Sequence, residues 1–130
     1  VMGSDFPDLE LMMPIEGRDD DAANQTIAAR LIAETPDLVG IYNIGAGTAG
    51  IGAALADAGR ADDIVFVGHD LTVHTRRFLL IGLMDAVISQ NPGREAHSAL
   101  RVLQALARKE PISPAQEVIG IDIIIRENLP

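Results

Sequence analysis

The chain has 130 residues, which is the size of one ordinary domain. It carries 19 acidic and 10 basic side chains, and a net charge of −9 argues against a nucleic-acid surface within it, because phosphate contacts need clustered Lys and Arg. It has no Cys, which excludes disulfides and thiolate sites, and no apolar run long enough to span a membrane.

Short apolar runs alternate with helical patterns along the chain. The apolar runs predict strands at Leu9–Ile15, Leu38–Ile44, Ile64–Val67, Ala86–Ser89 and Ile119–Ile125. The patterns between them predict helices at Asp21–Glu34, Ile51–Ala58, Thr75–Ile81 and Arg94–Arg108. This alternation predicts an α/β fold, a three-layer arrangement around a doubly wound parallel sheet.

Polar residues follow the predicted strands. In a doubly wound sheet, ligands bind beyond the carboxyl ends of the strands. Those ends carry Glu16–Asp19, Asn43–Gly47, His69–Asp70 and Gln90–Asn91. We therefore expect these segments to meet at one rim, where a small ligand binds.

A glycine-rich loop, with Gly45, Gly47 and Gly50, joins a strand-like run to a helix-like run. With an acid, Asp70, at the end of the next strand, the spacing matches a dinucleotide-binding fingerprint. The alternative is a small-residue turn with close helix–sheet packing through Gly50 and Ala54. The sequence leaves both interpretations open.

Asp70 and Gln90 are the strongest candidates for ligand contact. A carboxylate accepts hydrogen bonds from neighbouring hydroxyls, which suits a sugar or a ribose diol, and an amide both donates and accepts. The alternatives are that Asp70 caps the following helix and that Gln90 belongs to an ordinary turn.

The acidic cluster Glu16–Asp21 is interpreted as a solvated helix start rather than a cation site, because consecutive acids point in different directions. Arg18 is the exception, since a guanidinium on the rim reaches a ligand hydroxyl or carboxylate. The histidines His69, His74 and His97 lack metal-ligand spacing. We expect no metal, no cofactor and no catalytic residue.

Two segments together resemble a known family. Ile64–Asp70 reads as a strand ending Gly-aromatic-Asp, with His69 in the aromatic place, and Asp85–Pro92 reads as a strand ending Gln-x-Pro. This pattern resembles the sensor domain of LacI/GalR-type transcriptional regulators, a domain that also occurs in periplasmic ribose-type sugar-binding proteins. Thr35–Tyr42 and the ending Arg126–Pro130 are similar to the regulators as well, so the resemblance covers essentially the whole chain.

The resemblance implies roles for individual residues. Asp70 matches the aspartate that binds sugar hydroxyls, and Gln90 matches the glutamine at the hinge end of its strand. The family's Asn-Asp pair is replaced here by a loop in which Asn43, or amides near Gly45 and Gly47, would do its work. A ligand contact by His69 is a further hypothesis.

The resemblance also implies a function. The chain would be the C-terminal lobe of a periplasmic-binding-protein-like (type I) domain, with residues 91–130 crossing to a first lobe. It would be a non-enzymatic, cytoplasmic sensor of a sugar-like effector, with DNA bound only through an upstream helix-turn-helix domain. A stripe of leucines, Leu100, Leu103 and Leu106, predicts a homo-oligomer where the first lobe is absent. The alternatives are a periplasmic sugar-binding protein of an ABC transporter and an NAD(P)-dependent oxidoreductase.

Overall fold

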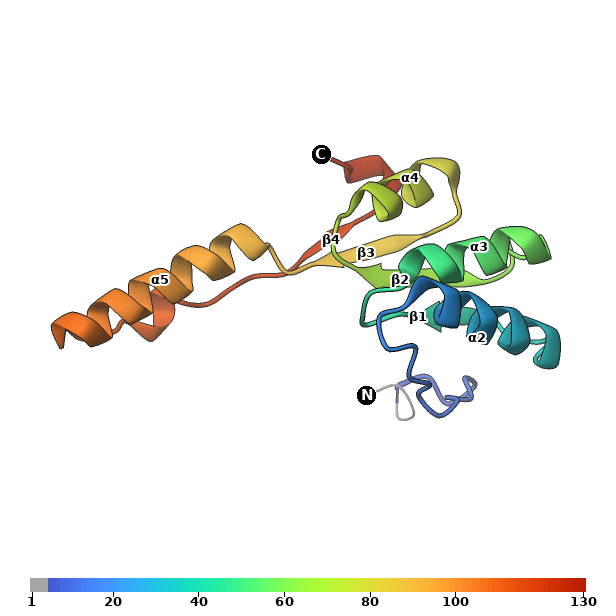
Figure 1. Cartoon of the computed structure of the whole chain (residues 1–130), viewed down its shortest axis with the longest axis horizontal. Coiled ribbons are helices and arrows are strands. Elements are labelled where there is room, and N and C mark those ends of the chain that lie inside the picture. Colours follow the sequence, from blue (N-terminus) through green and yellow to red (C-terminus); the bar gives the residue numbers. More distant parts are fainter. Residues whose placement is uncertain (1–4) are drawn as a thin grey trace.

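A four-stranded sheet lies at the centre of the molecule, in a computed structural model that describes residues 5–130 apart from the side chain of Gln116 (Figure 1). Its strands are β1 (Gly40–Tyr42), β2 (Val65–His69), β3 (Ala86–Ser89) and β4 (Asp122–Ile124). The α-helices are α2 (Asp21–Glu34), α3 (Thr48–Ala58), α4 (Val73–Ile81) and α5 (Pro92–Arg108). Two short 3₁₀ turns, Pro114–Gln116 and Arg126–Asn128, flank β4.

The sheet has the order β1-β2-β3-β4 and is mixed. β1, β2 and β3 are parallel, whereas β4 runs antiparallel to β3, with Val87 opposite Ile124. This differs from the all-parallel sheet expected from the sequence. After α5 the chain returns to the carboxyl end of β3 without a crossover helix over the sheet, and a strand that enters there runs back antiparallel.

The helices α2, α3 and α4 form one layer. Right-handed crossovers between consecutive neighbouring strands place α3 and α4 on the same face, and α2 lies beside α3 (Figure 1). On the covered face Phe66 and Val87 are fully buried, whereas on the opposite face Tyr42 is 57% and Val65 54% exposed. Within the described residues there are thus two layers instead of the expected three. A helix on the second face requires further strands beyond β1, because the winding direction reverses only there.

The contact between α2 and α3 is close enough to need a glycine. A Cβ on Gly50 would lie 1.8 Å from the backbone oxygen of Asp21, so the two helix backbones nearly touch. Asp20 caps α2 by accepting a hydrogen bond from the amide of Ala23 at 2.7 Å. The apolar residues buried around this contact are Ala28, Ile32, Ile51, Ala54 and Leu55.

Leu9–Ile15, predicted to be a strand, is not one. The segment has no regular secondary structure and is solvent-exposed, with Leu11 60% and Met13 84% exposed. A strand is stable only where a neighbour pairs with its amides and carbonyls, and among residues 5–130 no strand pairs with this segment. The prediction was wrong because an apolar pattern does not say whether a partner strand is present.

The other predicted elements are present with small changes at their ends. The predicted bounds of α2 and β3 are confirmed, whereas β1 and β4 are each shorter than predicted. Each of the other helices begins two or three residues earlier than predicted, because Gly47, Thr72 and Asn91 are their N-cap residues.

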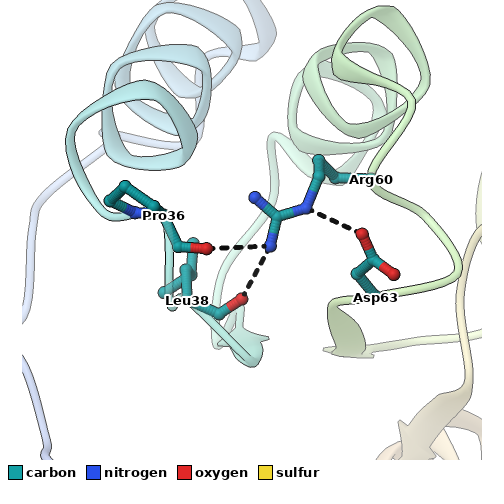
Figure 2. A network of polar contacts seen from close by, with 4 residues as sticks. All are labelled: Pro36, Leu38, Arg60 and Asp63. Carbon is teal, nitrogen blue, oxygen red and sulfur yellow. Dashed lines mark hydrogen bonds and ion pairs between the residues drawn. The ribbon is translucent and has the colours of Figure 1, made fainter.

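Arg60 joins α3 to the segment that leads into β1 (Figure 2). One guanidinium nitrogen donates to the carbonyls of Pro36 and Leu38, each at 3.3 Å, and Nε donates to Asp63 at 3.0 Å. These contacts lie at the amino ends of the strands, so they fix the sheet at the end opposite the predicted ligand rim.

An arm, formed by α5 and the returning residues 109–121, projects from this body (Figure 1). Glu117 of the return segment accepts hydrogen bonds from Ser98 and from Arg101, the latter at 2.9 Å. The hydrogen bond from Arg101, and after it that from Ser98, lowers the pKa of the Glu117 carboxyl below its usual range. The arm also carries three exposed leucines, Leu100, Leu103 and Leu106.

Candidate functional site

Two adjoining hollows lie at the carboxyl ends of β2 and β3. The larger, of about 360 Å³, is lined by Tyr42, His69, Ile88, Gln90, Glu95, Ile119 and Ile121. The smaller, of about 210 Å³, is lined by Asp70, Leu71, Ser89, Gln90, Pro92 and Glu95. Gln90 and Glu95 line both, so the hollows form one continuous candidate site. The predicted rim at the strand ends is therefore where the structure brings His69, Asp70 and Gln90 together.

Asp70 offers a free carboxylate to this site. Its backbone is held in the left-handed region at φ 63°, its amide donates to the carbonyl of Ile88 at 3.0 Å, and its own carbonyl accepts from the hydroxyl of Thr75 at 2.8 Å. The side chain is exposed and accepts no hydrogen bond from the part of the chain that the structure describes. Thr72, not Asp70, caps α4. The capping alternative for Asp70 is thereby removed, and its carboxylate stays available to a ligand.

His69 and Gln90 are joined in a hydrogen-bonded chain that begins at Tyr42. The Tyr42 hydroxyl lies 2.8 Å from His69 Nε2, and Gln90 Nε2 lies 3.2 Å from His69 Nδ1. The two rings are 5.6 Å apart between centroids and tilted by 41°. Three neighbouring strand ends thus supply one continuous polar line along the larger hollow.

The charges around the site are negative. Asp70 and Glu95 are the ionisable carboxyl groups among the lining residues, and neither Lys nor Arg lines either hollow. Carboxylates and an amide suit a ligand rich in neutral hydroxyls, because hydroxyls donate to carboxylates and exchange hydrogen bonds with amides. An anionic ligand would meet repulsion there.

Asn43, Gly45 and Gly47 serve the loop before α3. The Asn43 amide donates to the carbonyl of Gly45 at 2.8 Å and to the hydroxyl of Thr48 at 3.0 Å. A Cβ at Gly47 would lie 2.1 Å from Asn24 Nδ2, and one at Gly45 would lie 2.5 Å from Asp19 Oδ1. None of the three residues lines the hollows. The neighbours named above lie in the loop, at the start of α3 and near the start of α2, so a ligand contact by the three residues stays a prediction.

The dinucleotide interpretation fails at the same loop. The amide of Ala46 donates to Asp19 Oδ1 at 2.8 Å, and the amide of Gly50 donates to Asp21 Oδ1 at 3.3 Å. Side-chain carboxylates therefore take the amides that a pyrophosphate needs. The glycine spacing reflects the close approach of two helices, α2 and α3, at Gly50. The alternative left open by the sequence was close packing at Gly50 of a helix against the sheet, so it named the residue but not the partner.

Arg18 is not brought to the site. It lies exposed, at φ 51°, in the turn before α2 and lines neither hollow. The acidic residues beside it are not merely solvated, as expected from the sequence, because Asp19, Asp20 and Asp21 each accept a backbone hydrogen bond. Among residues 5–130 no cluster of three His, Asp or Glu is arranged to hold a metal ion.

Tyr42 and Glu95 are among the lining residues that the sequence reasoning did not name as site residues. Tyr42 ends β1 as His69 ends β2, so the rule that polar residues at strand ends converge was sufficient to find it. Glu95 lies in the first turn of α5, and only the direction in which α5 leaves the sheet brings it over Gln90.

Within residues 5–130, no helix combines the length and the apolar character that crossing a membrane requires.

Comparisons with known proteins identify the kind of chain. The model of a family described as "periplasmic binding protein domain" matches residues 1–111. No curated protein gives a match.

Three similar solved structures come from bacterial transport systems. A sugar-binding protein of a sugar ABC transporter from Bacillus halodurans has a TM-score of 0.82 and 26% identity, covering 98% of this chain and 48% of that one. An ABC transporter solute-binding protein from Agrobacterium vitis with bound D-fucose has 0.81 and 24%, covering 92% and 41%. A carbohydrate transporter solute-binding protein from Agrobacterium radiobacter, in complex with D-arabinose, has 0.86 and 20%, covering 98% and 43%. The chain thus spans less than half the length of these proteins.

These findings correct two predictions. The expected function as the sensor of a LacI/GalR-type regulator is wrong, because the similar structures are sugar-binding proteins of ABC transporters. The expected cytoplasmic location is wrong for the same reason. The two protein classes share one fold, so the strand-end motifs do not separate them, and the tail Arg126–Pro130 that favoured a regulator forms a 3₁₀ turn next to β4. The α/β periplasmic-binding-protein-like fold itself is confirmed.

Proposed function

The chain belongs to the family of periplasmic binding protein domains, and from that premise we propose that it is one lobe of a periplasmic protein that binds a neutral sugar for an ABC transporter. The observation that carries the proposal is the free, exposed carboxylate of Asp70 beside Gln90 at the carboxyl ends of β2 and β3. This function was the first alternative to a transcriptional regulator in the sequence analysis.

The ligand class follows from the chemistry of the lining. Asp70 accepts from two adjacent sugar hydroxyls, while Gln90 both donates and accepts. Ile88 and Leu71 provide apolar surface beside these groups, which suits the C–H face of a sugar ring. With two carboxylates and no lining cation, the site favours neutral sugars over sugar acids and sugar phosphates.

We further propose that the arm packs on a second lobe. Leu100, Leu103 and Leu106 are 60–64% exposed along one face of α5. An apolar stripe of this kind is stable when another surface covers it. The similar structures are about twice as long as this chain, which leaves room for a second lobe in such proteins. The homo-oligomer expected from the same leucines stays a prediction for the 130 residues taken alone.

The test is a titration of the intact protein with D-fucose, D-arabinose and their uronic acid and phosphate counterparts, by isothermal calorimetry. We expect binding of at least one neutral sugar and none of the anionic forms. Replacing Asp70 by Ala removes a charged hydrogen-bond acceptor, which lowers the affinity about 10- to 100-fold.

Asp62→Ala is the matched control. Asp62 is also an exposed aspartate, but it lies in the turn between α3 and β2, at the opposite end of the sheet. The proposal predicts unchanged affinity in this variant. Equal affinity of Asp70→Ala and the wild type for a bound sugar would contradict the assigned site, and a preference for the anionic sugars would contradict the ligand class.

A further inference from the structure

We propose that His69 and Tyr42 are positioning residues that set which end of the Gln90 amide meets the ligand, and that protonation of His69 reverses this choice. The inference rests on the proposed function, because it concerns the same site. It makes sugar binding depend on the protonation state of a residue that need not touch the sugar.

The geometry engages both ring nitrogens of His69. Nδ1 faces Gln90 Nε2 at 3.2 Å, and Nε2 faces the Tyr42 hydroxyl at 2.8 Å. The three residues come from the ends of β3, β2 and β1, which are neighbours in the sheet. A rotation of the Gln90 amide therefore breaks a contact that His69 otherwise holds.

The orientation of the Gln90 amide is coupled to the tautomer of His69. A neutral imidazole has one donor and one acceptor nitrogen. With Gln90 Nε2 facing Nδ1, Nδ1 is the acceptor, and the proton of neutral His69 lies on Nε2 and is donated to the Tyr42 oxygen. Gln90 is left with Oε1 turned toward the hollow, where it accepts from a sugar hydroxyl. The opposite tautomer requires the opposite orientation of the Gln90 amide.

Protonation of His69 makes both ring nitrogens donors. Two N–H groups then face each other at Nδ1 unless the Gln90 amide turns over and presents Oε1 to the ring. After that turn the amide N–H₂ faces the hollow and donates to the ligand. The same side chain thus changes from an acceptor to a donor when His69 gains a proton.

The groups around the imidazole do not include a second cation. Glu95 of α5 lines the same hollow, Asp70 follows His69 in the chain and lines the adjoining one, and Tyr42 is the titratable group on β1. The remaining lining residues of the larger hollow, Ile88, Ile119 and Ile121, carry no charge. A protonated His69 is therefore surrounded by the carboxylates of Glu95 and Asp70 and by the Gln90 amide, and not by another positive charge.

A first test needs no ligand. In ¹⁵N-labelled intact protein, the ring nitrogens of His69 and the side-chain amide of Gln90 are followed by NMR between about pH 8 and about pH 5. We expect the Gln90 side-chain signals to move with the same midpoint as the His69 ring, and Tyr42→Phe to shift the neutral ring toward the Nδ1–H tautomer. A Gln90 amide that stays in place while His69 titrates would overturn the proposal, whether or not any sugar binds.

A second test measures affinity. For D-fucose or D-arabinose, whichever binds, we expect the wild-type dissociation constant to change about fivefold between the two pH values, because one ligand hydrogen bond is exchanged. His69→Gln cannot titrate, so its affinity stays constant, while the control His74→Gln, exposed on α4, keeps the wild-type change.

The outcomes separate the two proposals. A wild type that binds none of the neutral sugars defeats the proposed function, and the NMR test still decides the inference. Sugar binding with the same pH dependence in wild type and His69→Gln, or with no dependence in the wild type, overturns the inference and leaves the proposed function standing.

Discussion

Replacing Gly50 with Ala destabilises the protein, on this account, although Ala is the better helix former. Gly50 lies in the first turn of α3. This helix lies beside α2 (Figure 1). The added Cβ would lie 1.8 Å from the carbonyl oxygen of Asp21 and 2.9 Å from the amide nitrogen of Gln25. Both neighbours are backbone atoms of a regular helix, so neither moves without moving α2.

The magnitude follows from two opposing terms. Ala in place of Gly in a helix gains up to about 1 kcal/mol from backbone entropy. Forcing a methyl group into a packed contact costs about 1–3 kcal/mol, and a collision with backbone belongs at the upper end. The expected net loss in the free energy of unfolding is about 2 kcal/mol.

The assay is urea unfolding followed by far-UV circular dichroism, because the chain has no Trp and a single Tyr. Gly93→Ala is the matched control, since Gly93 is also in the first turn of a helix but a Cβ there meets only the Asn91 side chain, at 3.8 Å. We expect Gly93→Ala to be neutral or slightly stabilising. A Gly50→Ala protein as stable as the wild type would refute the packing explanation of the glycine loop and reopen the ligand interpretation.

Three further predictions concern stability and the arm. Arg60→Ala loses the donor to Pro36 and Leu38 and lowers the unfolding free energy by about 1 kcal/mol, with partial recovery in Arg60→Lys, as measured by urea unfolding. Asp85→Ala leaves the amide of Phe66, which donates to Asp85 Oδ2 at 2.7 Å, without its partner, and costs about 1–2 kcal/mol, whereas Asp85→Asn retains an acceptor and most of the stability. The pKa of Glu117 is lowered in the folded protein, so its ionised form stabilises the folded state. This contribution to stability is fully present above the usual carboxyl pKa and is lost as the pH falls through the lowered pKa. NMR signals of residues 112–121 therefore shift at acid pH in the wild type and not in Glu117→Gln, and an unchanged pH response in that variant would contradict the assignment.

Local patterns predicted what depends on local physics. The bounds of α2 follow from an N-cap aspartate, an acidic first turn and an apolar stripe, all of which lie within the helix and its cap. β3 is bounded by residues that stop a strand, Asp85 before it and Pro92 shortly after it. These elements need no distant partner to be recognised.

Apart from the early helix starts, the structural errors involve partners far away in the sequence. Leu9–Ile15 has the composition of a strand, but strand formation depends on a neighbouring chain segment that an apolar pattern cannot reveal. β4 runs antiparallel because of the path of the return segment, which is set by the arm. The glycine loop was interpreted as a ligand loop because its actual partners, Asp19 and Asp21, come from a segment that looked solvated.

The candidate site divides in the same way. Asp70, Gln90 and His69 were predictable, because carboxyl ends of parallel strands share one rim. The His69 contact with Tyr42 spans 27 residues and arises only when β1 and β2 pair in their observed register. The site residues alone do not distinguish a regulator from a transport protein, because both classes share these strand ends. The similarity to solved structures of transport proteins is what favours the second class.

A crystal structure of the intact protein with its tightest-binding neutral sugar would show whether Asp70 holds the ligand. We expect two adjacent sugar hydroxyls within hydrogen-bond distance of the Asp70 carboxylate, and a third polar contact to Gln90, at the carboxyl ends of β2 and β3. A sugar bound elsewhere, with Asp70 still free, would contradict it.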